Sequence, residues 1–216
     1  LGRRQIHKKN ESHQPVNIPY VLLGTGLLWF GWFGFNAGSA LAANSVAIIA
    51  FMNTMLASAS AMVAWIMLDA ALGKKPTALG ACIGAVVGLV AITPAAGFVD
   101  FGPAVFIGFA ESIISNFAVN YKSKSDIDDT LDVFPCHGVG GIVGMIFTAV
   151  FAKEGGMITG SFTLMGYHLL ALVIISVFTF GGSYLLLKLT ERITPLRVPP
   201  EHEWMGLDIS QHGESV

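Results

Sequence analysis

Charged side chains are scarce in this chain of 216 residues: Asp, Glu, Lys and Arg together make up 12% of it, and the formal net charge is -2. Soluble globular domains have about 25% charged residues. With so little charge and no excess of basic residues, the chain has no electrostatic field for binding nucleic acid. The only two cysteines, Cys82 and Cys136, lie within apolar runs, which excludes a disulfide-based fold.

The chain also lacks the sequence patterns of hydrolases, kinases, P-loop proteins and zinc sites. We therefore expect no enzyme activity, no cofactor and no metal site. Apolar residues are what the chain has in abundance: 53% of it is hydrophobic, and it contains 25 glycines. This composition is typical of an integral membrane protein.

Six apolar runs follow a polar N-terminal segment, and each has the ~20 residues that a helix needs to cross a bilayer. The runs cover residues 18–43, 45–72, 77–96, 102–121, 133–152 and 162–189. None shows the strict alternation of barrel strands, so we predict an all-α, polytopic bundle of transmembrane helices. We divide the chain into an N-terminal loop (1–17), a six-span portion (18–190) and a C-terminal tail (191–216).

Lysine and arginine residues indicate how this bundle is oriented. Six crossings place eleven of the 12 basic residues on one face and only Lys153 on the other. The eleven are Arg3, Arg4, Lys8, Lys9, Lys74, Lys75, Lys122, Lys124, Lys188, Arg192 and Arg197. Positive charge accumulates on the cytoplasmic side of membrane proteins. We therefore predict a multi-pass protein of the cell membrane, surrounded by lipid, with the N-terminal segment and the tail in the cytoplasm.

Glycines recur at helical spacing on three of the predicted spans. They are Gly24, Gly31 and Gly38 on the first, Gly80, Gly84 and Gly88 on the third, and Gly140 and Gly144 on the fifth. Such stripes allow the backbones of neighbouring helices to approach closely in a membrane. We expect packing contacts at all three stripes, and a kink or end of the third helix at Pro94.

A lone histidine, His137, begins the otherwise apolar fifth run, within residues 132–144. Ionisable residues inside a membrane span are costly, usually face a cavity, and are candidates for function. The alternative is a packed histidine that donates a hydrogen bond to a carbonyl one turn away.

The first span carries a polar and aromatic set over residues 31–39, which includes Trp32, Phe35, Asn36 and Ser39. Counting residues along the spans puts the Ser39 hydroxyl outermost, then the Phe35 ring, then the His137 imidazole deeper in the membrane. This order suits a pathway for a small cation or amine, since ring faces and hydroxyls attract it. Taken alone, Trp32 is more typical of an interfacial anchor.

Three further polar residues are candidates for supporting roles. Asn36 could form a hydrogen bond between helices. Glu111, in the middle of the fourth span, must be paired, protonated or in contact with a cavity. Asp132 either caps the fifth span or orients groups at its mouth.

The chain resembles the ammonium transporter family in five stretches that follow one another in the family's order. They are residues 24–39, 80–82, 93–97, 132–144 and 206–214. The resemblance implies an eleven-span fold of two inverted five-helix halves and a last helix, assembled as a trimer with one pore per subunit. This chain is similar to spans six to eleven only. Because it also begins at Leu1, in a segment typical of an interhelical loop, we expect a partial subunit.

The resemblance implies roles for four residues. Phe35 corresponds to one of two gate phenylalanines, Ser39 to the hydroxyl of the outer ammonium site, His137 to the second of two pore histidines, and Trp32 to a pore-region tryptophan. Ammonium, or methylammonium, would lose its proton near the gate, and ammonia would pass the imidazoles. Pro135, Cys136 and Glu111 depart from the family pattern and leave the helix start and proton handling open.

By the same resemblance, the tail packs on the cytoplasmic face, couples subunits and binds a PII-type signalling protein. A disordered tail is the alternative. For the whole protein, the alternatives to transport are an ammonium sensor of the same fold that does not conduct, and a non-conducting fragment that assembles with a partner half.

Overall fold

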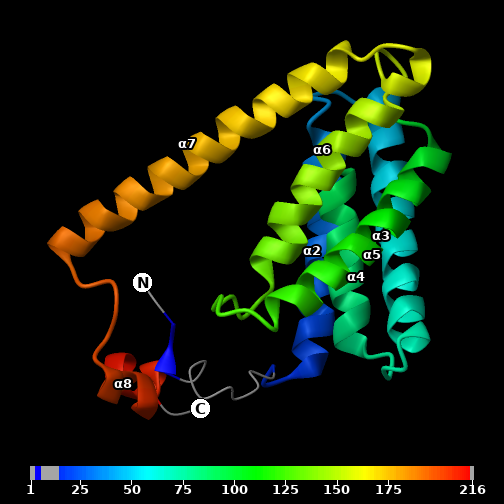
Figure 1. The fold of residues 1–216 in the computed structure, drawn as a ribbon. Coiled ribbons are helices and arrows are strands. Elements are labelled where there is room, and N and C mark those ends of the chain that lie inside the picture. The colour runs from blue at the N-terminus through cyan, green and yellow to red at the C-terminus, as the bar shows by residue number, and fades with distance from the viewer. Residues whose placement is uncertain (1–2, 6–14, 215–216) are drawn as a thin grey trace.

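The computed structural model describes residues 3–5 and 15–214, and every regular element within these ranges is helical (Figure 1). The long elements are α2 (Ile18–Gly38), α3 (Ser45–Ala71), α4 (Ala78–Ile92), α5 (Phe101–Lys122), α6 (Gly140–Phe151) and α7 (Thr163–Ile193). The short ones are η1 (Phe134–Val139), η2 (Met157–Thr159), α8 (Pro200–Met205) and η3 (Asp208–His212). Most of the predicted loop over residues 1–17 lies outside the described residues. The predicted all-helical fold is confirmed.

Among the described residues, five helical stretches are long and apolar enough to span a membrane; η1 and α6 together form one of them, Phe134–Phe151. The third predicted run, residues 77–96, contains a shorter helix than the others. α4 has 15 residues and ends at Ile92, which gives a rise of about 22 Å against the ~30 Å of a bilayer core. The chain continues as turns through Phe98, because Pro94 cannot donate to a helical ladder. The predicted effect of Pro94 is thus confirmed.

The backbones of α3, α4 and α6 are in direct contact at two of the glycine stripes. A Cβ atom added to Gly88 would lie 2.6 Å from the Ala57 carbonyl oxygen, and one added to Gly144 would lie 2.4 Å from that of Ala91. Neither position can hold a side chain without moving a helix. The stripes predicted on the third and fifth spans are therefore packing surfaces.

The stripe predicted on the first span does not pack within the described chain. A Cβ atom added to Gly24, Gly31 or Gly38 would meet nothing within 4 Å. That prediction is wrong here because the glycine-bearing side of α2 has no helix against it. Asn36, the one buried residue of α2, shows which side of this helix faces the bundle.

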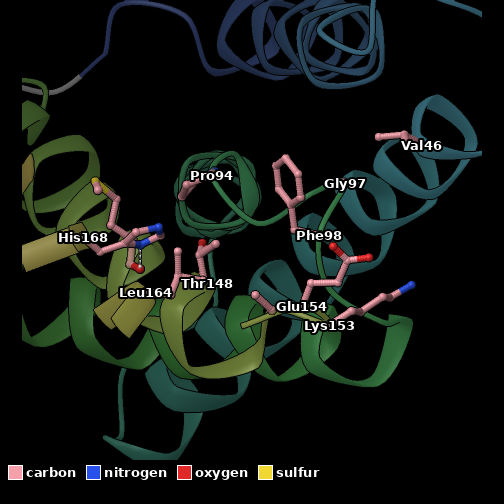
Figure 2. A pocket seen from close by; sticks show the side chains of 11 residues that line it. Val46, Pro94, Gly97, Phe98, Thr148, Lys153, Glu154, Leu164 and His168 are labelled. Atoms are coloured by element: carbon pink, nitrogen blue, oxygen red, sulfur yellow. Dashed lines mark hydrogen bonds between the residues drawn. The ribbon is translucent and has the colours of Figure 1, made fainter. Parts of the chain in front are cut away.

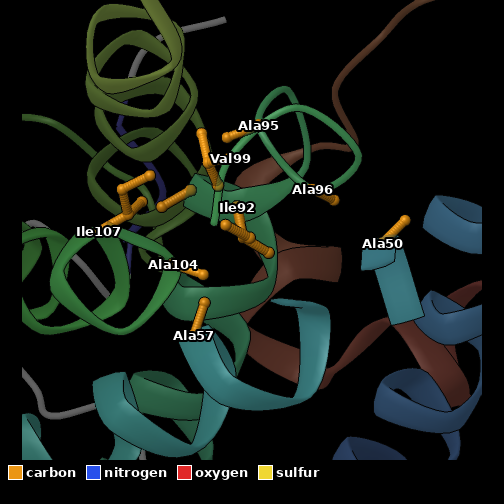
Figure 3. Close-up of a cluster of buried hydrophobic side chains, with 9 residues drawn as sticks. Ala50, Ala57, Ile92, Ala95, Ala96, Val99, Ala104 and Ile107 are labelled. Carbon is orange, nitrogen blue, oxygen red and sulfur yellow. The ribbon is translucent and has the colours of Figure 1, made fainter. Parts of the chain in front are cut away.

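Small apolar side chains form the buried cluster where α3, α4 and α5 meet the turns after α4 (Figure 3). Its members include Ala57, Ile92 and Ile107, none of which is exposed. Asn53 of α3 secures this junction: its Nδ2 donates to the carbonyl oxygens of Ala96 at 2.8 Å and Val99 at 2.9 Å. These bonds satisfy backbone groups that the irregular turns leave without helical partners.

Helix α7 has no buried residue, and its packing within the described chain is chiefly against α6. Figure 1 shows it leaving the end of α6 and diverging from the other helices. Val177 and Phe180 near its middle are 69% and 80% exposed. The divergence leaves a wide apolar surface between α7 and the rest of the bundle.

The C-terminal tail folds back to the N-terminal segment. The Arg197 Nη2 atom donates to the Arg3 carbonyl oxygen at 2.7 Å and to Glu203 Oε2 at 3.2 Å. Arg4 in turn donates to Asp128 in the loop after α5. The hydrogen bond to Asp128 raises the pKa of the Arg4 guanidinium above its ordinary value, so the pair stays charged. The tail is thus folded into short helices rather than disordered.

Candidate functional site

His137 lies in η1, a six-residue π-helical turn that continues directly into α6. Single π turns within α-helices occur frequently at functional sites. Asp129 holds the start of the turn: its carboxylate accepts from the backbone N–H of Val133 at 3.0 Å and of Phe134 at 2.8 Å. The next residue, Pro135, has no N–H to donate.

Asp132 does not cap the fifth span, so that alternative is wrong. Its backbone has a positive φ of 54°, and its Oδ1 lies 2.6 Å from Lys122 Nζ at the end of α5. The same Nζ donates to the Asp129 carbonyl oxygen at 2.6 Å. Asp129 therefore accepts from the free N–H groups at the start of η1, because the Asp132 side chain is turned toward Lys122. Asp132 thereby orients the loop at the mouth of the fifth span.

The His137 side chain is exposed to a cavity of about 780 Å³ between α2, α4, α6 and α7. Trp32, Thr93, Ile142 and Thr179 contribute to its lining. The imidazole has no hydrogen-bond partner among residues 3–5 and 15–214. This contradicts the packed-histidine alternative. Both ring nitrogens are available to a molecule in the cavity.

Trp32 joins this cavity to the aromatic end of α2. Its Nε1–H donates to Thr93 Oγ1 at 2.8 Å, and Thr93 Oγ1 donates to the Leu89 carbonyl oxygen at 2.7 Å. The Trp32 and Phe35 rings meet edge to face with centroids 5.9 Å apart. An interfacial anchor would keep its N–H in the headgroup region, whereas this one is bonded to another helix. The Trp32 indole is therefore held against the end of α4, and its place in a pore stays a prediction.

Phe35 and Ser39 continue along α2 beyond Trp32. Phe35 is 61% exposed and borders a cavity of about 400 Å³ with Trp32. The Ser39 hydroxyl, at the end of the helix, donates to the Phe35 carbonyl oxygen at 2.7 Å. A hydroxyl that donates to the backbone presents its lone pairs outward, where they can accept from an ammonium N–H. Ser39 and Phe35 therefore lie one turn apart at the end of α2, beyond Trp32.

The other two supporting candidates are buried away from the His137 cavity. Asn36 Nδ2 donates to Thr54 Oγ1 at 3.0 Å, which confirms the hydrogen bond predicted between helices. Glu111 is completely buried, and its Oε1 lies 2.5 Å from Ser115 Oγ. Glu111 does not line the His137 cavity. That Glu111 is paired, protonated or in contact with a cavity stays a prediction.

A second cavity, of about 600 Å³, lies toward the other end of α6 (Figure 2). His168 at the start of α7 lines it, with Nδ1 2.8 Å from the Met145 carbonyl oxygen. Lys153 also contributes to its lining and pairs with Asp100 at 2.7 Å. Lys153 and the His168 ring therefore already have protein partners, and no sequence pattern predicted a cavity here.

Two hydroxyl residues of the site were missed by the sequence analysis, Thr93 and Ser115. Thr93 holds the Trp32 indole, and Ser115 links Glu111 to the Pro135 carbonyl oxygen at 2.9 Å. Hydroxyls in apolar helices commonly bond to their own backbone. Their sequence positions therefore carry no signal of a bond to another helix, except that Thr93 directly precedes the helix-ending Pro94.

Known proteins place the chain in a family. The model of the Ammonium Transporter Family matches residues 1–216. A putative ammonium transporter of Methanothermobacter thermautotrophicus is 45% identical over 215 residues, which cover 95% of this chain and 53% of that protein. The chain spans about half the length of the curated relatives it matches.

Two solved structures share the fold. The crystal structure of Saccharomyces cerevisiae Mep2 has a TM-score of 0.84 and 36% identity, over 92% of this chain and 48% of that one. A structure titled Sensor Amt Protein has a TM-score of 0.83 and 34% identity, over 91% and 49%. With the family model covering the whole sequence, this membrane-spanning helical chain belongs to the ammonium transporter family.

Proposed function

We propose that this chain forms one side of a pathway that carries ammonium and ammonia, and also methylammonium, across the cell membrane. The observation that carries the proposal is the shared cavity of His137 and Trp32, continued along α2 by Phe35 and Ser39. Ammonium binds near the Ser39 lone pairs and the aromatic face, by hydrogen bonding and cation–π attraction. Phe35 acts as one of the gate residues.

The cavity around His137 favours passage of the neutral molecule. Its described lining is mainly apolar, with Val90, Ile142 and Leu172 among it. An apolar surrounding penalises the charged form of an amine, so ammonium gives up its proton before it enters. The His137 imidazole can then donate to or accept from ammonia, since no protein group occupies its nitrogens. No step of this pathway is enzymatic.

The chain works as part of a larger assembly in this proposal. The exposed apolar surfaces of α2 and α7 are covered by the preceding half of a complete subunit, by other subunits of a homotrimer, and by lipid. The basic residues put the 1–17 loop and the 191–216 tail in the cytoplasm, on either side of the 18–190 spanning portion. The folded tail is the docking surface for a PII-type regulator.

Transport can be tested in liposomes that contain a full-length transporter including this chain. An ammonium gradient should change the internal pH faster than in protein-free liposomes, and methylammonium should compete. Ammonium binding without any such flux would instead support the alternative of an ammonium sensor of the same fold that does not conduct.

A further inference from the structure

Glu111 is a buried carboxyl that the proposed pathway does not use. It lies in the middle of α5 with no exposed surface, and no described cation forms an ion pair with it. Its Oε1 lies 2.5 Å from Ser115 Oγ, one turn further along the helix. Ser115 Oγ lies 2.9 Å from the carbonyl oxygen of Pro135, two residues before His137.

Glu111, Ser115 and the Pro135 carbonyl form a row of three hydrogen-bonding groups, and the number of protons they share limits the protonation state of Glu111. The Ser115 hydroxyl has one proton and can donate to only one neighbour, while a carbonyl oxygen can only accept. If Ser115 donates to Pro135, then Glu111 must donate to Ser115, and its carboxyl is neutral. If Glu111 were ionised, a fully buried charge would have a single hydroxyl donor and its Oε2 would have no partner, which is costly.

The carboxyl also contacts the chain on the other side of His137. A Cβ atom added to Gly140 would lie 3.3 Å from Glu111 Oε1 and 3.1 Å from Val90 Cγ1. Gly140 follows His137 by three residues and begins α6. Glu111 and Ser115 therefore touch η1 before the histidine and the start of α6 after it.

We propose that Glu111 is a neutral positioning residue: it donates to Ser115, Ser115 donates to the Pro135 carbonyl, and this link fixes the π turn that aims His137 into the cavity. The link matters because Pro135 has no N–H to add to the backbone ladder at the start of the turn. The bond from Ser115 to the Pro135 carbonyl ties this weakly bonded turn to α5, and lipid supplies no water that could do so. The expected effect of this link on transport rests on the proposed function. Its expected effect on the π turn does not depend on that function.

The two buried cysteines provide a measurement of the turn itself. Cys136 lies next to His137 and is 5% exposed, whereas Cys82 on α4 is 6% exposed. In a full-length transporter, maleimide labelling of each is read by peptide mass spectrometry. Ser115→Ala and Glu111→Ala should raise labelling of Cys136 about tenfold, which corresponds to about 1.4 kcal/mol of easier local opening. Labelling of Cys82 should not change.

Two variants serve as controls for these substitutions. Ser112→Ala removes an equally buried hydroxyl of α5 that donates to the Ala61 carbonyl of α3 at 2.8 Å, so it should leave labelling of Cys136 unchanged. Glu111→Gln keeps a neutral donor of the same shape and should behave like the unsubstituted protein. Equal labelling of Cys136 in Ser115→Ala and Ser112→Ala would overturn the proposed link. Labelling of Cys136 as fast in Glu111→Gln as in Glu111→Ala would overturn the proposal that the Glu111 carboxyl is neutral.

Transport by the same variants separates positioning from folding. Per folded transporter, Ser115→Ala and Glu111→Ala should lower the maximal methylammonium flux on the order of tenfold, with little change in KM, since a small misplacement acts on the passage step rather than on outer binding. A purely structural role would lower only the amount of folded protein. A different outcome would separate the two proposals. If the variants raise labelling of Cys136 but transport stays normal, and His137→Ala also leaves transport normal, the proposed ammonium pathway is contradicted. The proposed link from Glu111 through Ser115 to Pro135 would still stand.

Discussion

The side chains around His137 are held by hydrogen bonds between helices. Trp32 is bonded to Thr93, and Ser115 to Pro135 just before the histidine. In a membrane such bonds contribute about 1–2 kcal/mol at most, but they fix direction as well as distance. The site is thus defined by a few polar contacts within an apolar surrounding.

The Trp32–Thr93 bond can be tested by Thr93→Val, which keeps the side-chain shape but removes the acceptor. The unpaired indole N–H should cost about 1–2 kcal/mol and let the ring turn, so methylammonium uptake should fall several-fold. Thr148→Val is the control, because the Thr148 hydroxyl donates only to the Gly144 carbonyl of its own helix. Equal uptake in the two variants would argue against a role for the bond.

The sequence predicts His137, Trp32, Phe35 and Ser39 as one set, because histidine and clustered aromatics are unusual inside a span. The structure brings His137 and Trp32 to one cavity, and the roles of all four stay a prediction of the sequence. The sequence was not sufficient to assign Asp132, since only the fold shows that Asp129 reaches the free N–H groups while Asp132 turns to Lys122. The links made by Thr93 and Ser115 are between distant segments, and a one-dimensional pattern does not contain them.

The helices themselves follow from the apolar runs, and their packing follows from glycine. Direct contact of α4 with α3 at Gly88 and of α6 with α4 at Gly144 explains how such short, smooth helices form a core. The sequence could not show that the glycine stripe of α2 faces away from these helices. Residue spacing identifies a helix face without side chains, but it does not identify which helix packs against that face. The sequence also overestimated α4, whose apolar run continues past the point where Pro94 ends the helix.

Substitution of Gly144 by alanine should separate α6 from α4. The added Cβ would lie 2.4 Å from the Ala91 carbonyl oxygen, so a helix must shift, at a cost of about 1–3 kcal/mol. Thermal unfolding in detergent should show a lower Tm than for Gly141→Ala, whose added carbon meets nothing within 4 Å. Identical Tm values would mean that the close contact does not stabilise the bundle.

The whole chain presents more apolar surface than its own helices can cover. Helix α7 buries no residue, and the cavity of His137 lies open between α7 and the bundle. The curated relatives that it matches are about twice as long, and the chain covers 48% of the Mep2 structure. The helical fold of this chain is therefore predictable from its sequence, whereas the closed pathway that we propose needs a larger assembly.

Liposomes that contain only residues 1–216 should not conduct ammonium. The described residues line the pathway from one side, so water and lipid would enter the His137 cavity. Internal pH should respond to an ammonium gradient at the rate of protein-free liposomes, while the full-length transporter responds faster. Ammonium-driven flux through the short chain alone would show that it closes a pathway by itself or with further copies.

The most direct measurement of the central claim is methylammonium uptake by the full-length transporter carrying His137→Ala, compared with His168→Ala at equal membrane levels. His137 faces the proposed pathway with both ring nitrogens free of protein partners, whereas His168 lines the other cavity and is bonded to the Met145 carbonyl. We predict that uptake falls about tenfold or more in the His137 variant and changes little in the His168 variant. Unchanged uptake in His137→Ala would contradict the account.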